Sequence, residues 1–317
     1  MKAYEEQWAG TWGGRSRTRD WNREARVRSG ESATPWRASD PGDLFAVELL
    51  PHVSHPTVSA LGSDARRELC RRALVRYLHS VSVLEIRVVN VVAAEIAHGF
   101  LGEALSGDVR RAALQLTCDE GYHAVLAADL LEHVAPQHTP SAPIFFERLN
   151  DFLDEQARDA HDALFLKFLF TVVTETSITA NMRVLARGND VTPAVRSFVA
   201  DHARDEAWHG SFFSALFRTH WARLSESERT RYGALLPTLI DVYLRADTGA
   251  ILADLRAVGI GRGASEEVWC ESFGSAHLRE TNKAASAPVL ACFRRAGALV
   301  GETHEAFVAA GLVERAA

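Results

Sequence analysis

Residues 193–224 read PAVRSFVADHARDEAWHGSFFSALFRTHWARL, and this stretch decides the fold. It follows a Gly-Asn-Asp turn at 188–190, begins with a proline, and has the length of a long helix. Glu206 and His209 stand three residues apart within it. Side chains at that spacing project from one helix face and can converge on one metal ion.

The same Glu-x-x-His pattern recurs as Glu120-Gly-Tyr-His123 in VRRAALQLTCDEGYHAVLAADLLEHV, residues 109–134. A single motif of this kind arises often by chance, whereas two of them in alternate helices are much more specific. Carboxylate-bridged di-iron proteins use two such motifs and add one glutamate from each of the other two helices of a four-helix bundle. The sequence therefore predicts such a bundle with two further glutamate ligands.

Hairpin geometry identifies these two glutamates, because residues equidistant from the turn of an antiparallel hairpin lie at the same height. The connection between the first two helices centres near residue 103, which is 17 residues before Glu120 and 18 after Glu85. The turn at 188–190 centres close to the midpoint between Glu175 and Glu206. Glu85 and Glu175 are therefore predicted to face the two motifs.

His202 precedes Glu206 by four residues, so it lies on the same helix face one turn away. It is either a third imidazole ligand or a core histidine that hydrogen-bonds a carboxylate, and the neighbouring ligand positions favour ligation. The predicted metal ligands are Glu85, Glu120, His123, Glu175, His202, Glu206 and His209.

A third Glu-x-x-His, Glu95-Ile-Ala-His98, lies in the first helix. The hairpin places it level with residues 108–111, about three turns from Glu120. We interpret it as a pair at a helix end that takes no part in the metal site.

The alternative to a metal site is a buried network of glutamates and histidines. Burying Glu85 in SVLEIRVV and Glu175 in TVVTETSI would be costly without a cation. Carboxylates and imidazoles without thiolates suit two adjacent iron or manganese ions, and zinc sites usually use fewer carboxylates. Two iron ions are the predicted cofactor, with manganese or a mixed pair as the alternative.

The whole chain is predicted to be all-α. Residues 1–60 are expected to form an irregular N-terminal arm, and residues 61–317 one domain with its four-helix bundle at about 63–225. Helical segments at 226–317 either cover the bundle or form a dimer interface. The arm contains aromatic residues that favour wrapping over disorder, namely Trp8, Trp12, Trp21 and Trp36.

Composition excludes several classes of protein. The formal net charge of −6 and a pI near 6.1, without a basic run, do not suit nucleic-acid binding. No uninterrupted apolar segment approaches about 18 residues, so a membrane span is not expected. The four cysteines form no Cys-x-x-Cys pair, which argues against disulfides or a thiolate zinc site and favours a cytoplasmic protein.

With these residues in place, the chain resembles the p-aminobenzoate N-oxygenase family of ferritin-like di-iron enzymes over about residues 63–250. The family's distinguishing mark is a histidine ligand one turn before the last Glu-x-x-His, which is the place of His202. The resemblance rests on RYLHSVSVLEIRVVN at 76–90, DEGYH at 119–123, TETS at 174–177 and DHARDEAWH at 201–209.

The resemblance implies a ferritin-like fold, two irons, O2 as co-substrate, and oxidation of an arylamine to hydroxylamine, nitroso and nitro products. It also implies two iron positions, with His202 added to the second. The first is formed by Glu85, Glu120 and His123, and the second by Glu175, Glu206, His209 and His202.

Other functions share this ligand set. A di-iron C–H hydroxylase or desaturase is the first alternative, a radical generator the second, and a non-enzymatic metal-storage or metal-sensing bundle the third. The expected partners are a small-molecule amine from specialised metabolism and a second copy of the chain in a homodimer. Without a dinucleotide fingerprint or a cysteine cluster, electrons are expected from an external reductase.

Residues beside the ligands are candidates for supporting roles. A metal-bound histidine usually donates its other ring N–H to a carboxylate or carbonyl. The neighbouring aspartates that suit this role are Asp119, Asp201 and Asp205. Candidate pocket residues, each more often a packing residue, are Tyr122, Thr174, Asn181 and Trp208.

Overall fold

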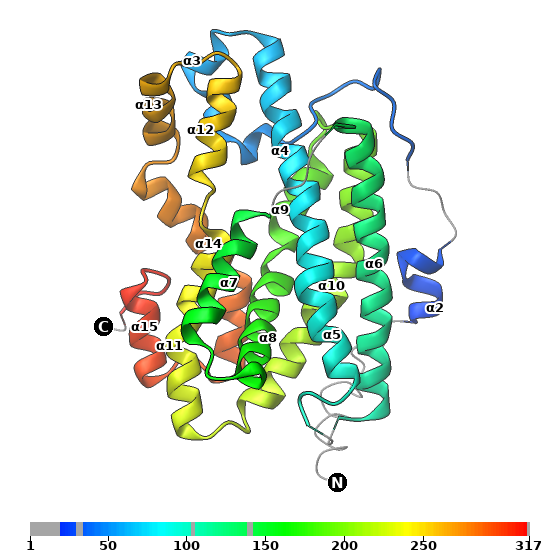
Figure 1. The fold of residues 1–317 in the computed structure, drawn as a ribbon, viewed down its shortest axis with the longest axis vertical. Helices are drawn as coiled ribbons and strands as arrows, with labels where there is room; N and C mark the ends of the chain where they lie inside the picture. Colours follow the sequence, from blue (N-terminus) through cyan, green and yellow to red (C-terminus); the bar gives the residue numbers. More distant parts are fainter. Residues whose placement is uncertain (1–19, 30–33, 103–104, 138–141, 316–317) are drawn as a thin grey trace.

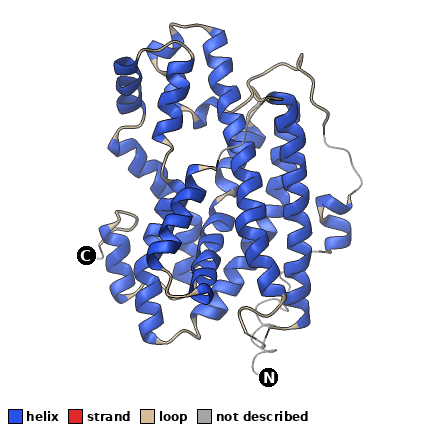
Figure 2. Ribbon diagram, in the orientation of Figure 1, coloured by secondary structure: helices blue, strands red, loops and turns tan. Residues whose placement is uncertain are grey.

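The computed structural model describes residues 20–29, 34–102, 105–137 and 142–315. Within these ranges the secondary structure is helical and contains no strand, as Figure 2 shows. The nearest approach to a sheet is one isolated bridge between Asp43 and Val191. The all-α prediction is confirmed.

Four long helical runs form the bundle at the centre of Figure 1. The first run packs on the second and the third on the fourth, and the second and fourth runs also contact each other. The runs are α4 (Ser63–Leu84) with η4 (Glu85–Val89) and α5 (Asn90–Ala97); α6 (Gly107–Val134); α8 (Ala160–Ser177) with α9 (Thr179–Arg187); and α10 (Pro193–Trp221). This arrangement is consistent with the predicted ferritin-like bundle.

The first run is interrupted at Glu85 by the π-helical segment η4. Such widened turns are rare in helices and occur frequently at functional sites. Glu85 is the first residue of the segment, and its side chain is buried. The widened turn therefore begins at a predicted metal ligand.

The third run contains a long apolar stretch. By length and composition, Ala160–Arg187 could cross a membrane, but 71% of its most apolar window is buried inside the protein. A helix at the centre of a bundle is expected to be apolar on nearly every face. Lys167 and Glu175 interrupt its sequence, which is why no unbroken apolar segment is visible there.

Further helices pack on the outside of the bundle. α11 and α14 pack against α8, α7 packs against both α8 and α11, and α12 contacts α4 (Figure 1). Asp162 in the first turn of α8 accepts hydrogen bonds from Arg231 and Tyr232 of α11, which fixes the two helices together. The helices are α7 (Ile144–Gln156), α11 (Glu226–Leu244), α12 (Thr248–Ala257), α13 (Arg262–Ser272), α14 (Ser275–Arg295) and α15 (Gly301–Ala309).

The described part of the N-terminal arm contains short helical turns. Its first segment lies beside α6 in Figure 1, and η1 contacts both α6 and α10. Farther along, Asp43 hydrogen-bonds the backbone of Asp190 and Thr192 in the turn before α10. Trp8 and Trp12 lie outside the described residues. The turns are α2 (Trp21–Glu24), η1 (Arg26–Arg28), η2 (Val47–Leu49), η3 (Pro51–Ser54) and α3 (Pro56–Ser59).

Candidate metal centre

All the predicted ligands lie together inside the bundle. Each of these side chains is at most 2% exposed, and every long run contributes at least one. The first run supplies Glu85, α6 supplies Glu120 and His123, α8 supplies Glu175, and α10 supplies His202, Glu206 and His209.

The donor atoms fall into two groups, each compact enough to hold one metal ion. The first group is Glu85, Glu120, His123, His202 and Glu206, and the second is Glu120, Glu175, Glu206 and His209. Glu120 and Glu206 belong to both groups, so their carboxylates are placed to bridge two ions. The sequence left the bridging residues open, and the geometry favours these two.

His202 differs from the position that the family resemblance implied. Its Nε2 lies 2.8 Å from Glu85 Oε1, and its ring centroid is 4.1 Å from that of His123. The donor atoms therefore group His202 with Glu85 and His123, whereas the resemblance implied the group of His209. The reason is helix geometry: His202 lies one turn before Glu206 and His209 one turn after it, so the two imidazoles stand on opposite sides of that carboxylate.

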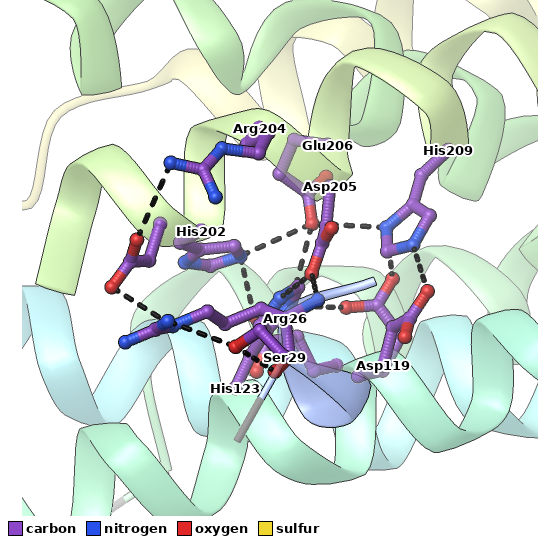
Figure 3. A network of polar contacts seen from close by, with 12 residues as sticks. Arg26, Ser29, Asp119, His123, His202, Arg204, Asp205, Glu206 and His209 are labelled. Carbon is purple, nitrogen blue, oxygen red and sulfur yellow. Dashed lines mark hydrogen bonds and ion pairs between the residues drawn. The ribbon is translucent and has the colours of Figure 1, made fainter. Parts of the chain in front are cut away.

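The outer side of two histidines is held by aspartates from the opposite motif. His123 Nε2 lies 3.1 Å from Asp205 Oδ2, and His209 Nε2 lies 3.4 Å from Asp119 Oδ2 (Figure 3). Because a carboxylate accepts the Nε2 proton, each Nδ1 is left to face the glutamates as a ligand. Asp119 and Asp205 therefore make the contacts with ligand histidines that the predicted supporting role requires.

Asp201 takes a different role from the predicted one. Its carboxylate pairs with the Arg26 guanidinium at 3.1 Å and with Arg204 at 3.8 Å. Asp201 lies on the same face of α10 as Asp205 but one turn earlier, and there its partner is Arg26 of the arm. It connects α10 to the N-terminal arm and does not hold a ligand histidine.

The donor set fits a pair of cations. Within the described residues, all four glutamates have at least one buried carboxylate oxygen without a hydrogen-bond partner. Such buried oxygens are costly unless a cation neutralises them. Four carboxylates with neutral imidazoles balance the charge of two divalent ions. The observed atoms therefore match the predicted di-metal site better than a closed polar network.

Protons occupy the cluster when no cation is bound. Burial raises the pKa of Glu85 to about 7 and raises that of Glu175 well above its ordinary value. Burial acts to lower the pKa of His123, but hydrogen bonds to Asp205 and Glu120 outweigh it and raise this pKa to about 10. Bound cations would displace these protons, since metal ligands must be deprotonated.

Comparison with known proteins agrees with this geometry. The p-aminobenzoate N-oxygenase AurF family matches residues 27–297, which is most of the chain. The chain belongs to this family. It is also 26% identical over 230 residues to the 4-aminobenzoate N-oxygenase of Streptomyces thioluteus, covering 71% of this chain and 68% of that protein. Membership in the N-oxygenase family confirms the prediction of an oxygenase that acts on nitrogen.

The remaining sequence-based candidates have structural roles or lie away from the cluster. Glu95 and His98 are both exposed near the end of α5, as expected of a helix-end pair. Thr174 is buried and donates to the Thr171 carbonyl, and Trp208 stacks on Phe212 at a centroid distance of 5.7 Å. Tyr122 is half-buried on α6.

The side chain of the fourth pocket candidate, Asn181, lies outside the described residues.

Two residues near the cluster were missed by sequence analysis, because only the fold brings them close. Tyr77 and Tyr243 are half-buried against the core, and nearby glutamates add to desolvation in raising the pKa of both phenols. For Tyr77 these are Glu85 and Glu206.

Gly210, the residue after His209, allows α10 to approach α8 at the metal centre. A Cβ at this position would stand 2.6 Å from the Glu175 carbonyl oxygen. Gly210→Ala is therefore expected to push α8 outward, to destabilise the fold by about 1–3 kcal/mol, and to reduce metal binding at Glu175. Denaturant unfolding and metal content measure the two effects.

Gly121 provides the matched control, since it follows Glu120 but a Cβ there meets no atom within 4 Å. Gly121→Ala is expected to keep full metal content and to leave stability unchanged or raise it by up to about 1 kcal/mol. Equal behaviour of the two alanine variants would show that close packing at Gly210 does not position Glu175.

Proposed function

We propose that this protein is a non-haem di-iron N-oxygenase that oxidises the amine of an aromatic substrate in specialised metabolism, with 4-aminobenzoate or a close analogue as substrate. The observation that carries the proposal is the presence of two groups of metal donors, one of five residues and one of four, that share Glu120 and Glu206. The chain that contains them belongs to the N-oxygenase family. The name of the Streptomyces thioluteus relative supports the aromatic amine.

The first oxidation joins one oxygen atom of O2 to the amine nitrogen and reduces the other to water, which consumes two electrons and two protons. When bound, the iron pair supplies the binding and reduction of O2. The glutamates would hold the ions, and Asp119 and Asp205 would keep His209 and His123 in the tautomer that binds metal.

Apolar packing excludes water from the cluster. Phe198 lies edge-on to His202 with ring centroids 5.9 Å apart, and Phe212 is fully buried one turn beyond His209. A dry site strengthens every electrostatic contact within it and prevents loss of oxidising equivalents to solvent. The surroundings thus favour reaction with a bound amine.

The proposal also includes the electron donor, the cellular location, the oligomeric state and the division of the chain. An external reductase supplies the electrons. A cytoplasmic location is supported by the four cysteines, each of which is a free thiol. A homodimer is supported by exposed apolar side chains on neighbouring helices: Ile86, Val91, Leu114 and Val125. The proposed division remains an arm at 1–60, a bundle at about 63–225 and covering helices at 226–317.

An activity assay tests the function directly. Iron-loaded protein reduced with dithionite is exposed to O2 with 4-aminobenzoate, and mass spectrometry is expected to detect 4-hydroxylaminobenzoate and more oxidised nitrogen products. 4-Methylbenzoate, which carries a C–H group in place of the amine, is expected to remain unchanged. Ring or methyl hydroxylation without any N-oxidation would contradict the proposal and favour the C–H hydroxylase.

A further inference from the structure

A short piece of the N-terminal arm, residues 20–29, lies against the outer side of the metal centre. α2 stands beside α6 in Figure 1, and η1 contacts both helices that carry a Glu-x-x-His motif, α6 and α10. α2 itself contains no buried residue, whereas Ala25 and Arg26 directly after it are buried. Residues 20–29 are therefore attached to the bundle at few points, and two of these points are the aspartates that contact ligand histidines.

The first point of attachment is Asp119. Its Oδ1 accepts a hydrogen bond of 2.9 Å from the indole Nε1–H of Trp21, while its Oδ2 faces His209 Nε2 at 3.4 Å. Asp119 is fully buried. The Arg28 guanidinium lies over the Trp21 ring, 5.7 Å from its centroid, and helps to hold the indole in place.

The second point of attachment is Asp205, the equivalent aspartate of the other motif. Its Oδ2 lies 3.1 Å from His123 Nε2 and accepts a 3.4 Å hydrogen bond from the backbone N–H of Arg26. The Arg26 side chain pairs with Asp201 one turn earlier on α10. Figure 3 shows Arg26 and Ser29 of the arm in the same polar network as the histidines.

The arm therefore donates a hydrogen bond to each aspartate that holds a ligand histidine. A buried carboxylate with fixed donors is held in one orientation and is stabilised in its charged form. The orientation of such an outer partner determines the tautomer and aim of the histidine that it holds. The bundle supplies the ligands, and the arm supplies part of the support behind them.

We propose that Trp21 is a positioning residue of the metal centre, which holds His209 in its metal-binding orientation through Asp119. This inference rests on the proposed di-iron function. It assigns to the N-terminal arm, which supplies none of the predicted ligands, a role in retaining the metal ions.

Trp21→Phe tests the proposal, because it keeps an aromatic ring and removes the N–H donor. The full-length protein is loaded with Fe2+ without oxygen, and ferrozine absorbance records the rate of iron release. Trp21→Phe is expected to release iron roughly tenfold faster, at the low end of the range for outer partners of metal ligands. Trp36→Phe, the same change in a packing residue of the arm, is expected to match the wild type.

A double-mutant cycle identifies the route of the effect. In an Asp119→Asn background, Trp21→Phe is expected to accelerate iron release less than about twofold, because the shared partner is already altered. In Co2+-loaded protein, Trp21→Phe is also expected to shift the hyperfine-shifted N–H proton signal of His209, which a general loss of packing elsewhere would leave in place.

The outcomes separate the two proposals. Wild-type protein that retains no iron overturns the di-iron function, and this inference with it. Wild-type protein that retains two irons while Trp21→Phe and Trp36→Phe release them at the same rate overturns only the role of Trp21. A full tenfold effect of Trp21→Phe in the Asp119→Asn background shows that the indole does not act through Asp119, and also overturns it.

Discussion

Glu206→Ala is expected to remove both metal ions and abolish N-oxygenation, because one oxygen of this carboxylate is close to every histidine of the centre. Glu206 Oε1 lies 3.1 Å from His202 Nε2, 3.1 Å from His209 Nδ1 and 3.7 Å from His123 Nδ1. Loss of a shared ligand should exceed the ~10–100-fold loss of metal affinity caused by outer partners. Metal analysis after gel filtration and the 4-aminobenzoate assay measure both losses.

The metal-free form of Glu206→Ala is expected to unfold at a lower temperature than the metal-free wild type, because buried His202 and His209 lose the carboxylate that they share. Glu95→Ala is the matched control, since Glu95 is the exposed glutamate of the third Glu-x-x-His, and it should keep full metal content and activity. Two metals per chain in Glu206→Ala would contradict the bridging role.

His202→Ala is expected to leave about one metal ion per chain and to lower the rate of N-oxygenation more than about 100-fold. The remaining ion is the one held by Glu175 and His209, because His202 belongs to the group that contains Glu85 and His123. His98→Ala, in the exposed third Glu-x-x-His motif, is the control and should behave as the wild type.

Double variants identify which ion is lost. If His202 and Glu85 serve the same ion, His202→Ala/Glu85→Ala should still bind one metal per chain, whereas His202→Ala/Glu175→Ala should bind none. Unchanged metal content and turnover in His202→Ala would show that this residue is a core histidine bonded to carboxylates. The reverse pattern in the double variants would place His202 on the ion of Glu175.

Much of the site could be predicted because helices are regular. Glu120 with His123 and Glu206 with His209 follow from the i, i+3 spacing, and Glu85 follows from equal rise per residue on either side of a turn. The same geometry separated the cluster from Glu95, which is exposed in the structure. These inferences need only local periodicity and the antiparallel order of the helices.

Other features could not be predicted because they depend on contacts between distant segments. The π-helical segment that begins at Glu85 contains no turn-forming or helix-breaking residue from which the sequence could predict it. The family resemblance implied that His202 joins His209, and only the packed bundle shows that its Nε2 faces Glu85. The hydrogen bond from Trp21 to Asp119 joins residues 98 positions apart, and no spacing rule connects them.

Anomalous diffraction at the iron edge from crystals of the iron-loaded protein tests the central claim most directly. The structure predicts two iron peaks per chain, both in contact with Glu120 and Glu206. His202 and Glu85 should bind the ion that also binds His123, and Glu175 and His209 should bind the other. A single peak, no peak within the bundle, or two peaks that do not share Glu120 and Glu206 would contradict this account.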